Sequence, residues 1–422
     1  MSIKTILYWV ARIIVGAVFT FSGFVKAIDP WGFTYKIQDY LAAMGDAMTI
    51  FADLAFAGAV VLSAIELVVG LCLIFDIRTK ESSWIAALLM LFMTPLTLWI
   101  ALENPVQDCG CFGDALIIDN WTTFWKNVIL CIFIAYLLFQ AKNFKSTIST
   151  QKQWLFVGYS LIFSITLSIY CYYYLPIIDF RPYHIGANIE EGMSIPDDAE
   201  QDIYDIKLIY ERNGEQQIVS LEEYDQLDST WQFVDQQTTL IKKGYEPPIH
   251  DFTIDTEEDG DITKEVLADD NYTFIIVAYD LTLMNRSEEV MNQLRDLAEF
   301  ADEQNYRCIL LTASIPTDIE KFKEELDSDN VIFATTDKIT LKTIIRDNPG
   351  VLLVKDATIF NKWCVNTLPE FEQPLESSEF VTIANPHETQ NVLLVILFYL
   401  FPIAIVMFFD KRKIKILQTK KY

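Results

Sequence analysis

Six long apolar stretches constrain the fold of this chain more than any other feature. A helix needs about 20 apolar residues to cross the hydrocarbon core of a bilayer. Stretches of this kind lie at 6–26, 52–75, 83–102, 122–140, 154–175 and 391–409. Arg12 interrupts the first stretch and no small-residue cleavage site follows it, so we interpret it as an uncleaved span and not as a signal peptide. The sequence therefore predicts a membrane helical bundle of six spans.

Loop charges predict the orientation of these spans. The basic loops are 77–83, 140–153 and 410–422, and the intervening loop 103–120 is acidic. Cytoplasmic loops carry an excess of lysine and arginine. We therefore expect a multi-pass protein of the inner membrane with both termini cytoplasmic. The loop 103–120 and the stretch 176–390 are then periplasmic, where disulfides persist.

The composition supports two kinds of domain. The chain is 52% hydrophobic, yet its net charge is -26, a combination typical of membrane spans joined to an acidic soluble domain. Membrane lipid is therefore an expected partner, and nucleic acid is not, because phosphate binding requires basic patches. We expect a four-span membrane domain at 1–140, followed by a cytoplasmic loop and the fifth span at 141–175. An acidic linker with a β-hairpin is expected at 176–244 and a soluble domain at 245–390. The sixth span and its basic tail are expected at 391–422.

The segment "QDCGCFGDA" (107–115) carries the strongest chemical signal. A disulfide between Cys109 and Cys111 would close a tight ring, and strain makes such a bond easier to reduce. Gly110 provides the backbone freedom for this ring, and Gly113 for the turn that follows. We interpret the two cysteines as a redox pair that acts on a periplasmic thiol protein. A structural staple and a soft-metal site such as copper remain alternatives, although no histidine lies in the first five spans, and we predict no metal site.

Glu66 lies inside the second stretch and needs a partner, because a charge within a span costs at least about 2.5 kcal/mol. Arg12 lies at a similar depth in the first stretch, so we expect the two to pair. The pair is either a structural ion pair or a proton site. A proton site would be linked to a membrane quinone, the only cofactor suggested, because thiol oxidation releases protons that a quinone takes up. Lys26 is expected to extend to the outer surface.

Outside the spans, two regions have recognisable patterns. In 30–50 apolar residues recur at helical spacing, which predicts a helix lying on the outer membrane surface that anchors a loop or roofs the two cysteines. Alternating residues flank Asn213-Gly214 within 204–226 and predict a hairpin. Across 245–366, buried strands alternate with helices and end in a hairpin, which predicts an α/β sheet domain.

The first four spans resemble the DoxX/MauE family of four-helix membrane proteins over about residues 8–140. The resemblance rests on "RIIVGAVFTFSGFVKAIDP", "AIELVVGLCLIF" and especially "DCGCFGD". It implies a four-helix membrane core and a thiol–disulfide role in the redox maturation of exported proteins, with Cys109 and Cys111 as the redox pair. It also extends to three ionisable residues of the first two spans, Arg12, Lys26 and Glu66.

The soluble domain resembles the thioredoxin-like fold over about residues 245–366. The segments "EPPIHDFTI", "FIIVAYD" and "NPGVLLVKDATIFNKW" carry the resemblance, and Asn348-Pro349 stands where that fold has a cis proline. The segment 278–290 has no cysteine where the family has its reactive thiols. Without a thiolate there is no nucleophile, so we interpret this domain as catalytically inactive and as a binding platform.

Three classes of function remain open. The favoured class is a membrane thiol–disulfide oxidoreductase acting through Cys109 and Cys111. The alternative is a non-catalytic scaffold or assembly factor whose thioredoxin-like domain binds an envelope client. The third is a carrier, which six spans would allow, but Pro95 is the only clear breaker within a span, and transporters usually have a matched pair.

The predicted topology can be tested with fusions to a reporter that is active only in the cytoplasm. Fusions at residues 150 and 422 should be active, because both positions follow basic segments, and fusions at 115 and 300 should be inactive. Reporter activity at residue 300 would place the acidic domain inside the cell and contradict the orientation.

Overall fold

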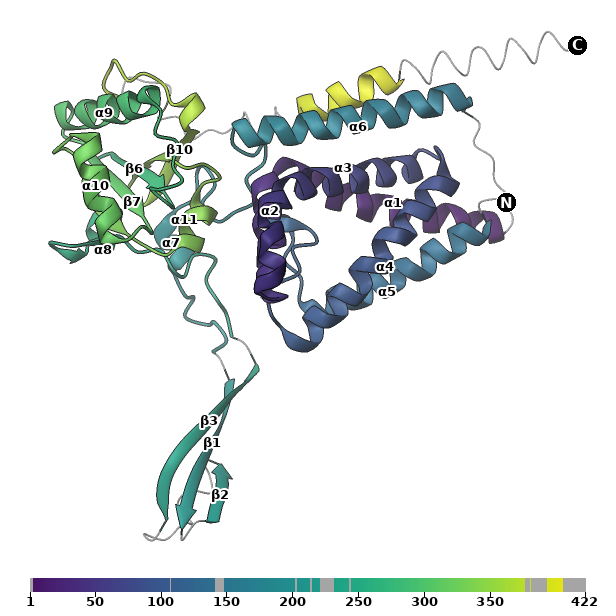
Figure 1. The fold of residues 1–422 in the computed structure, drawn as a ribbon, viewed down its shortest axis with the longest axis horizontal. Helices are drawn as coiled ribbons and strands as arrows, with labels where there is room; N and C mark the ends of the chain where they lie inside the picture. The colour runs from purple at the N-terminus through teal and green to yellow at the C-terminus, as the bar shows by residue number, and fades with distance from the viewer. Residues whose placement is uncertain are drawn as a thin grey trace, which may run out of the picture.

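The computed structural model describes residues 3–106, 108–140, 148–201, 203–212, 215–220, 231–242, 244–375, 380 and 393–404. Figure 1 shows three parts: a bundle of long helices, an α/β domain at one end of the bundle, and a three-stranded arm that projects from the α/β domain. Together with the apolar character of the helices, this arrangement confirms the expected combination of a membrane bundle and an α/β sheet domain.

Among the residues that the structure describes, five helical segments are long and apolar enough to cross a membrane. They consist of α1 (Ile3–Ile28), η1 with α3 (Asp46–Leu54 and Ala55–Ile74), α4 (Thr79–Glu103), α5 (Asn120–Gln140) and α6 (Thr150–Tyr173). The chain is therefore a multi-pass membrane protein, as predicted for the first five spans.

The sixth predicted span is described only over the apolar helix Leu393–Ala404. This helix packs along α6, where the Tyr159 hydroxyl donates to the Phe398 carbonyl at 2.9 Å and the Ser160 and Tyr399 hydroxyls lie 2.7 Å apart. The rest of the predicted span, the basic tail and residues 141–147 of the loop 140–153 lie outside the described residues.

Helices α1 and α3 pack unusually closely, because glycines stand where they cross. A Cβ atom on Gly23 would lie 2.3 Å from the Leu67 backbone nitrogen, and one on Gly70 would lie 2.3 Å from the Thr20 nitrogen. Small residues at such positions let two membrane helices approach to backbone contact. This packing brings polar side chains of α1 against α3 near one end of the bundle.

Helix α2 (Pro30–Ala43) confirms the predicted helix between the first two spans. Asp29 caps it by accepting a hydrogen bond from the Gly32 nitrogen at 2.9 Å, and Pro30 occupies the first turn, where a missing N–H costs nothing. Beyond residue 45 the chain continues as η1 toward α3. Figure 1 shows α2 at the end of the bundle that faces the α/β domain.

The α/β domain contains a seven-stranded sheet of order β10-β9-β6-β7-β8-β4-β5. Its strands are β4 (Asp255–Thr256), β5 (Gly260–Asp261), β6 (Thr273–Ala278), β7 (Arg307–Thr312), β8 (Ile332–Thr335), β9 (Gly350–Lys355) and β10 (Thr358–Cys364). Strands β6, β7 and β8 are parallel, whereas β9 runs antiparallel to β6 and β10 antiparallel to β9. The helices are α7 (Ile189–Met193), α8 (Thr263–Leu267), α9 (Glu288–Glu303), α10 (Pro316–Leu326) and α11 (Lys338–Ile344), followed by the short η4 (Val365–Thr367).

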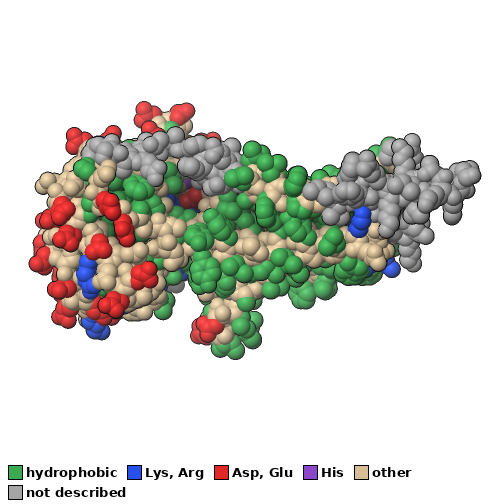
Figure 2. Space-filling model, turned by 90° about the horizontal axis from the view of Figure 1, so that it is seen from above, with side chains coloured by type: hydrophobic (Ala, Val, Ile, Leu, Met, Phe, Trp, Pro, Cys, Tyr) green, Lys and Arg blue, Asp and Glu red, His purple; other side chains and the backbone are tan. Residues whose placement is uncertain are grey.

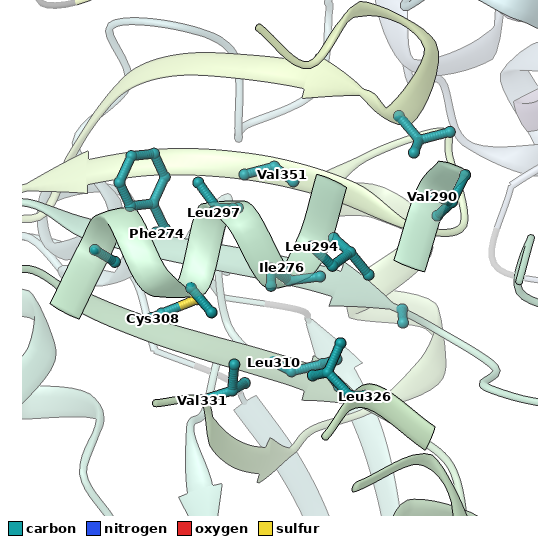
Figure 3. Packing of buried hydrophobic residues seen from close by; sticks show 14 of the residues in the cluster. Phe274, Ile276, Val290, Leu294, Leu297, Cys308, Leu310, Leu326, Val331 and Val351 are labelled. Carbon is teal, nitrogen blue, oxygen red and sulfur yellow. The ribbon is translucent and has the colours of Figure 1, made fainter. Parts of the chain in front are cut away.

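Apolar side chains of α9 and the central strands form the core of this domain. Figure 3 shows Leu294 and Leu297 of α9 lying over Phe274 and Ile276 of β6. Leu294, Phe274 and Ile276 have no exposed surface. The peptide between Asn348 and Pro349, just before β9, is cis, as expected from the sequence.

The projecting arm is a separate antiparallel sheet of order β2-β1-β3, built from β1 (Ile203–Arg212), β2 (Glu215–Ser220) and β3 (Gln232–Lys242). Arg212 pairs with Glu215, which confirms the predicted hairpin, although the turn at 213–214 itself lies outside the described residues. The third strand was not predicted.

The acidic residues are concentrated on the α/β domain. On the face shown in Figure 2, aspartate and glutamate side chains cover this domain, whereas apolar side chains cover much of the bundle. This separation explains how a chain with a net charge of -26 also contains apolar membrane spans.

Leu294→Ala should destabilise the α/β domain by about 2–5 kcal/mol, because it leaves a cavity beneath α9. Pulse proteolysis of the full-length protein over a urea series measures this loss. Glu299→Ala, on the exposed side of the same helix, is the matched control and should change stability by less than about 0.5 kcal/mol. An equal response of both variants would contradict the described core.

Candidate redox site

The loop that joins α4 to α5, residues 104–119, contains both cysteines of the Cys-Gly-Cys motif; we refer to it as the CGC loop. Gly110 and Gly113 have φ values of +57° and +53°, a conformation that residues with a side chain rarely adopt. The loop is tightened by two hydrogen bonds, from the Gly110 nitrogen to Asp108 Oδ1 at 2.7 Å and from the Gly113 nitrogen to the Gly110 carbonyl at 3.1 Å. The two glycines therefore adopt the turn geometry that the motif requires.

The two thiols are adjacent and free in this structure. Cys109 Sγ accepts a hydrogen bond from the Cys111 nitrogen at 3.3 Å and lies 3.5 Å from Thr123 Oγ1. A hydrogen bond from the Cys111 thiol lowers the pKa of Cys109 to about 6, against the opposing effect of burial. The same bond raises the pKa of Cys111 well above its ordinary value. The hydrogen bond between the thiols therefore favours the thiolate on Cys109 and the proton on Cys111.

Helix α2 covers the CGC loop from the side of the α/β domain. Lys36 Nζ lies 2.7 Å from Asp108 Oδ2, and the Lys36 side chain packs on Gly110, where a Cβ atom would lie 2.9 Å from Lys36 Cγ. The Tyr40 hydroxyl donates to the Cys109 carbonyl. Cys109 is only 7% exposed, whereas Cys111 is partly exposed.

A buried ion pair lies beneath the loop, but it differs from the predicted one. Glu66 pairs with Lys26, whose Nζ lies 2.8 Å from Oε2, and the Ser22 hydroxyl is 2.7 Å from both Glu66 Oε2 and the Cys111 carbonyl. Arg12 instead pairs with Asp76 at 2.6 Å, so the expected Arg12–Glu66 pair is not formed. Lys26 is buried and does not extend to the surface, because the close packing of α1 and α3 places Glu66 beside it.

A small cavity of about 40 Å³ adjoins this pair and Cys111. A water molecule needs roughly 10–15 Å³ of such space, so the cavity accommodates a few waters, whereas ligand pockets occupy about 300–1,000 Å³. Lys126 also lines it, with its Nζ 4.3 Å from the centre of the Phe112 ring. A quinone ring therefore does not fit between these side chains as they stand. Within the described residues, no three His, Cys, Asp or Glu side chains are grouped to hold a metal ion.

Several residues of the site were not singled out from the sequence. Lys126 could have been singled out from the sequence, because a charged residue in the first turns of an apolar helix needs a partner or a function. The others are contributed by different elements and carry no local pattern: Ser22, Tyr40, Thr123 and Arg346. Arg346, at the end of α11, lies 2.9 Å from both Asp29 and Asp114.

Comparison with known proteins identifies the membrane domain. Residues 4–140 match the family described as methylamine utilisation protein MauE, close to the range of about 8–140 expected from the sequence. Residues 204–243, which include the arm, match a family described as a domain of unknown function (DUF8463). A search of curated proteins found no match. Residues 4–140 are therefore similar to the MauE family, and their described helices are long and apolar enough to cross a membrane.

Proposed function

We propose that the protein is an inner-membrane thiol–disulfide redox protein that exchanges electrons with exported proteins through Cys109 and Cys111. The observation that carries the proposal is the asymmetry of the pair: one thiol has a pKa of about 6 and the other a strongly raised pKa. The MauE-like membrane domain suggests a role in redox maturation. Neighbouring thiols with such separated pKa values can act as leaving group and as attacked sulfur in disulfide exchange.

The exchange balances without any further reactant. In the oxidised state, a client thiolate attacks Cys111, and the Cys109–Cys111 bond breaks with Cys109 leaving as the thiolate, because Cys109 is the better leaving group. A second client thiolate then attacks the client sulfur of the mixed disulfide, and Cys111 is released and takes up a proton. The client has lost two electrons and gained a disulfide, and the pair has become a dithiol. A low leaving-group pKa accelerates the first step.

Regeneration of the disulfide requires an acceptor of two electrons. A membrane quinone is the acceptor that the sequence suggested, but the cavity beside Cys111 is too small for its ring, and we assign no step to it. Ser22, Glu66 and Lys26 link the Cys111 carbonyl to a buried carboxylate. Their role in the proposal is to hold the loop and to keep the carboxylate charge paired.

The α/β domain is proposed to be a thioredoxin-like binding domain in the periplasm. The order β10-β9-β6-β7, with β6 and β7 parallel and β9 and β10 antiparallel, supports the fold. The segment 278–290 has no cysteine, which supports an inactive domain. Tyr279, which follows β6, lies against Tyr35 of α2, so this end of the central strand faces the membrane domain.

Cys109→Ala and Cys111→Ala should each abolish complementation of a deletion strain while the protein stays at normal abundance. Closing so short a loop removes little chain entropy, so losing its disulfide should not unfold the bundle. Neither single variant can form the Cys109–Cys111 bond, so client protein should accumulate in its reduced form. Non-reducing gels of trapped cells measure this. Full rescue by the double variant would overturn the proposal in favour of the scaffold.

Alkylation by iodoacetamide should reveal the thiolate on Cys109. In the reduced wild-type protein its rate should rise with a midpoint near pH 6, because only the thiolate reacts. In Cys111→Ala the stabilising hydrogen bond is lost, so the midpoint should move upward. Mass spectrometry of the peptide that contains Cys109 gives the rate at each pH. The same midpoint in both proteins would show that the thiols are not coupled.

A further inference from the structure

One side chain of the α/β domain holds the CGC loop and α2 at the same time. Arg346 Nη2 lies 2.9 Å from Asp29 Oδ2 and 2.9 Å from Asp114 Oδ2, and its Nε lies 3.1 Å from Asp29. The Arg346 side chain is 7% exposed. Asp29 caps α2, and Asp114 follows Cys111 by three residues in the CGC loop. A planar guanidinium can hold two carboxylates in fixed geometry. Arg346 therefore fixes the start of α2 and the CGC loop relative to each other.

The contact around Arg346 is a complementary surface and not an isolated ion pair. Lys342 lies in the last turn of α11, four residues before Arg346, and its Nζ lies 4.1 Å from the centre of the Tyr35 ring of α2. Its charge acts on Asp39 of the same helix. In a chain with a net charge of -26, these cations of the α/β domain face acidic and aromatic side chains of α2. Such complementarity favours one docked orientation.

The docked arrangement has three layers. The α/β domain lies on one face of α2, and the other face covers the CGC loop through Lys36 and Tyr40. Cys109 is 7% exposed beneath it. Disulfide exchange requires a partner sulfur to approach the attacked sulfur directly. A protein thiol that comes from the side of the α/β domain therefore meets α2 first.

We propose that docking of the α/β domain controls access of partner proteins to Cys109 and Cys111, with Arg346 as the positioning residue. In the docked state the α/β domain covers α2 and, through Arg346, contacts the CGC loop, and breaking the bonds from Arg346 to Asp29 and Asp114 opens that side of the loop. The inference rests on the proposed function, since it regulates the same thiols. It gives the inactive domain a task that needs no cysteine of its own.

Access can be measured directly with a bulky polyethylene-glycol maleimide on the reduced full-length protein in membranes. The reagent reacts with the open fraction, so its rate reports the docking equilibrium. Arg346→Gln should raise the rate of labelling at Cys109, the sulfur that reacts as the thiolate, by roughly tenfold or more, the order expected when charge-assisted bonds are lost. The double variant Cys109→Ala/Cys111→Ala gives the background from other cysteines.

Further variants separate docking from misfolding. Asp114→Asn should raise the rate less than Arg346→Gln, and combining the two should add little, since both remove the same contact. Lys342→Glu should also raise it, because it reverses a charge at the same surface. Arg346→Lys should restore part of the protection. Lys323→Gln, which removes an exposed ion pair with Glu320 elsewhere on the domain, is the control and should label like wild type.

An unchanged rate in both Arg346→Gln and Lys342→Glu would overturn the inference. Pulse proteolysis of each variant shows whether the α/β domain stays folded, and only folded variants are compared. Labelling does not depend on electron transfer. If docking does not control access, the labelling rates stay unchanged but Cys109 and Cys111 remain essential in complementation. If the proposed redox function is wrong, the cysteine variants complement the deletion strain and the labelling rates are unaffected.

Discussion

The buried Lys26–Glu66 pair is the constraint on which the rest of the site depends. A charge within an apolar span is tolerated only with a partner, and removing one member of a buried pair costs about 3–5 kcal/mol. The pair forms because Gly23 and Gly70 let α1 and α3 approach to backbone contact. Ser22 joins Glu66 to the Cys111 carbonyl, so the CGC loop rests on this polar cluster and not on lipid.

The atoms that surround each sulfur determine how the two cysteines differ in reactivity. Cys109 accepts hydrogen bonds from the Cys111 nitrogen and thiol, which favour its thiolate, whereas the same thiol contact and burial favour the proton on Cys111. Two identical side chains one residue apart thereby become unequal. The inequality arises from the turn that Gly110 permits, because that turn directs the Cys111 nitrogen at the Cys109 sulfur.

The sequence predicted the features that repeat along the chain and missed those that join distant segments. The length of the apolar stretches predicted the five spans that the structure describes, and the alternation of strands with helices predicted the α/β sheet. Depth along a helix does not reveal which side a residue faces, so Arg12 was paired with Glu66 although it contacts Asp76. Strand β3 has exposed residues on both faces and no periodicity to detect. Arg346 lies 317 residues from Asp29, beyond any local pattern.

The way the α/β domain is attached to the membrane has a kinetic consequence. The domain leaves the bundle at the end of α6 and returns to the helix Leu393–Ala404, and these two helices pack against each other. Tethering at both ends keeps the domain at a high effective concentration beside α2. A modest interface is therefore sufficient to keep it docked, and after each release it rebinds before it can diffuse away. In the proposed gate, dissociation of a few ionic contacts sets how long the domain stays docked, and rebinding of the tethered domain sets how long it stays open.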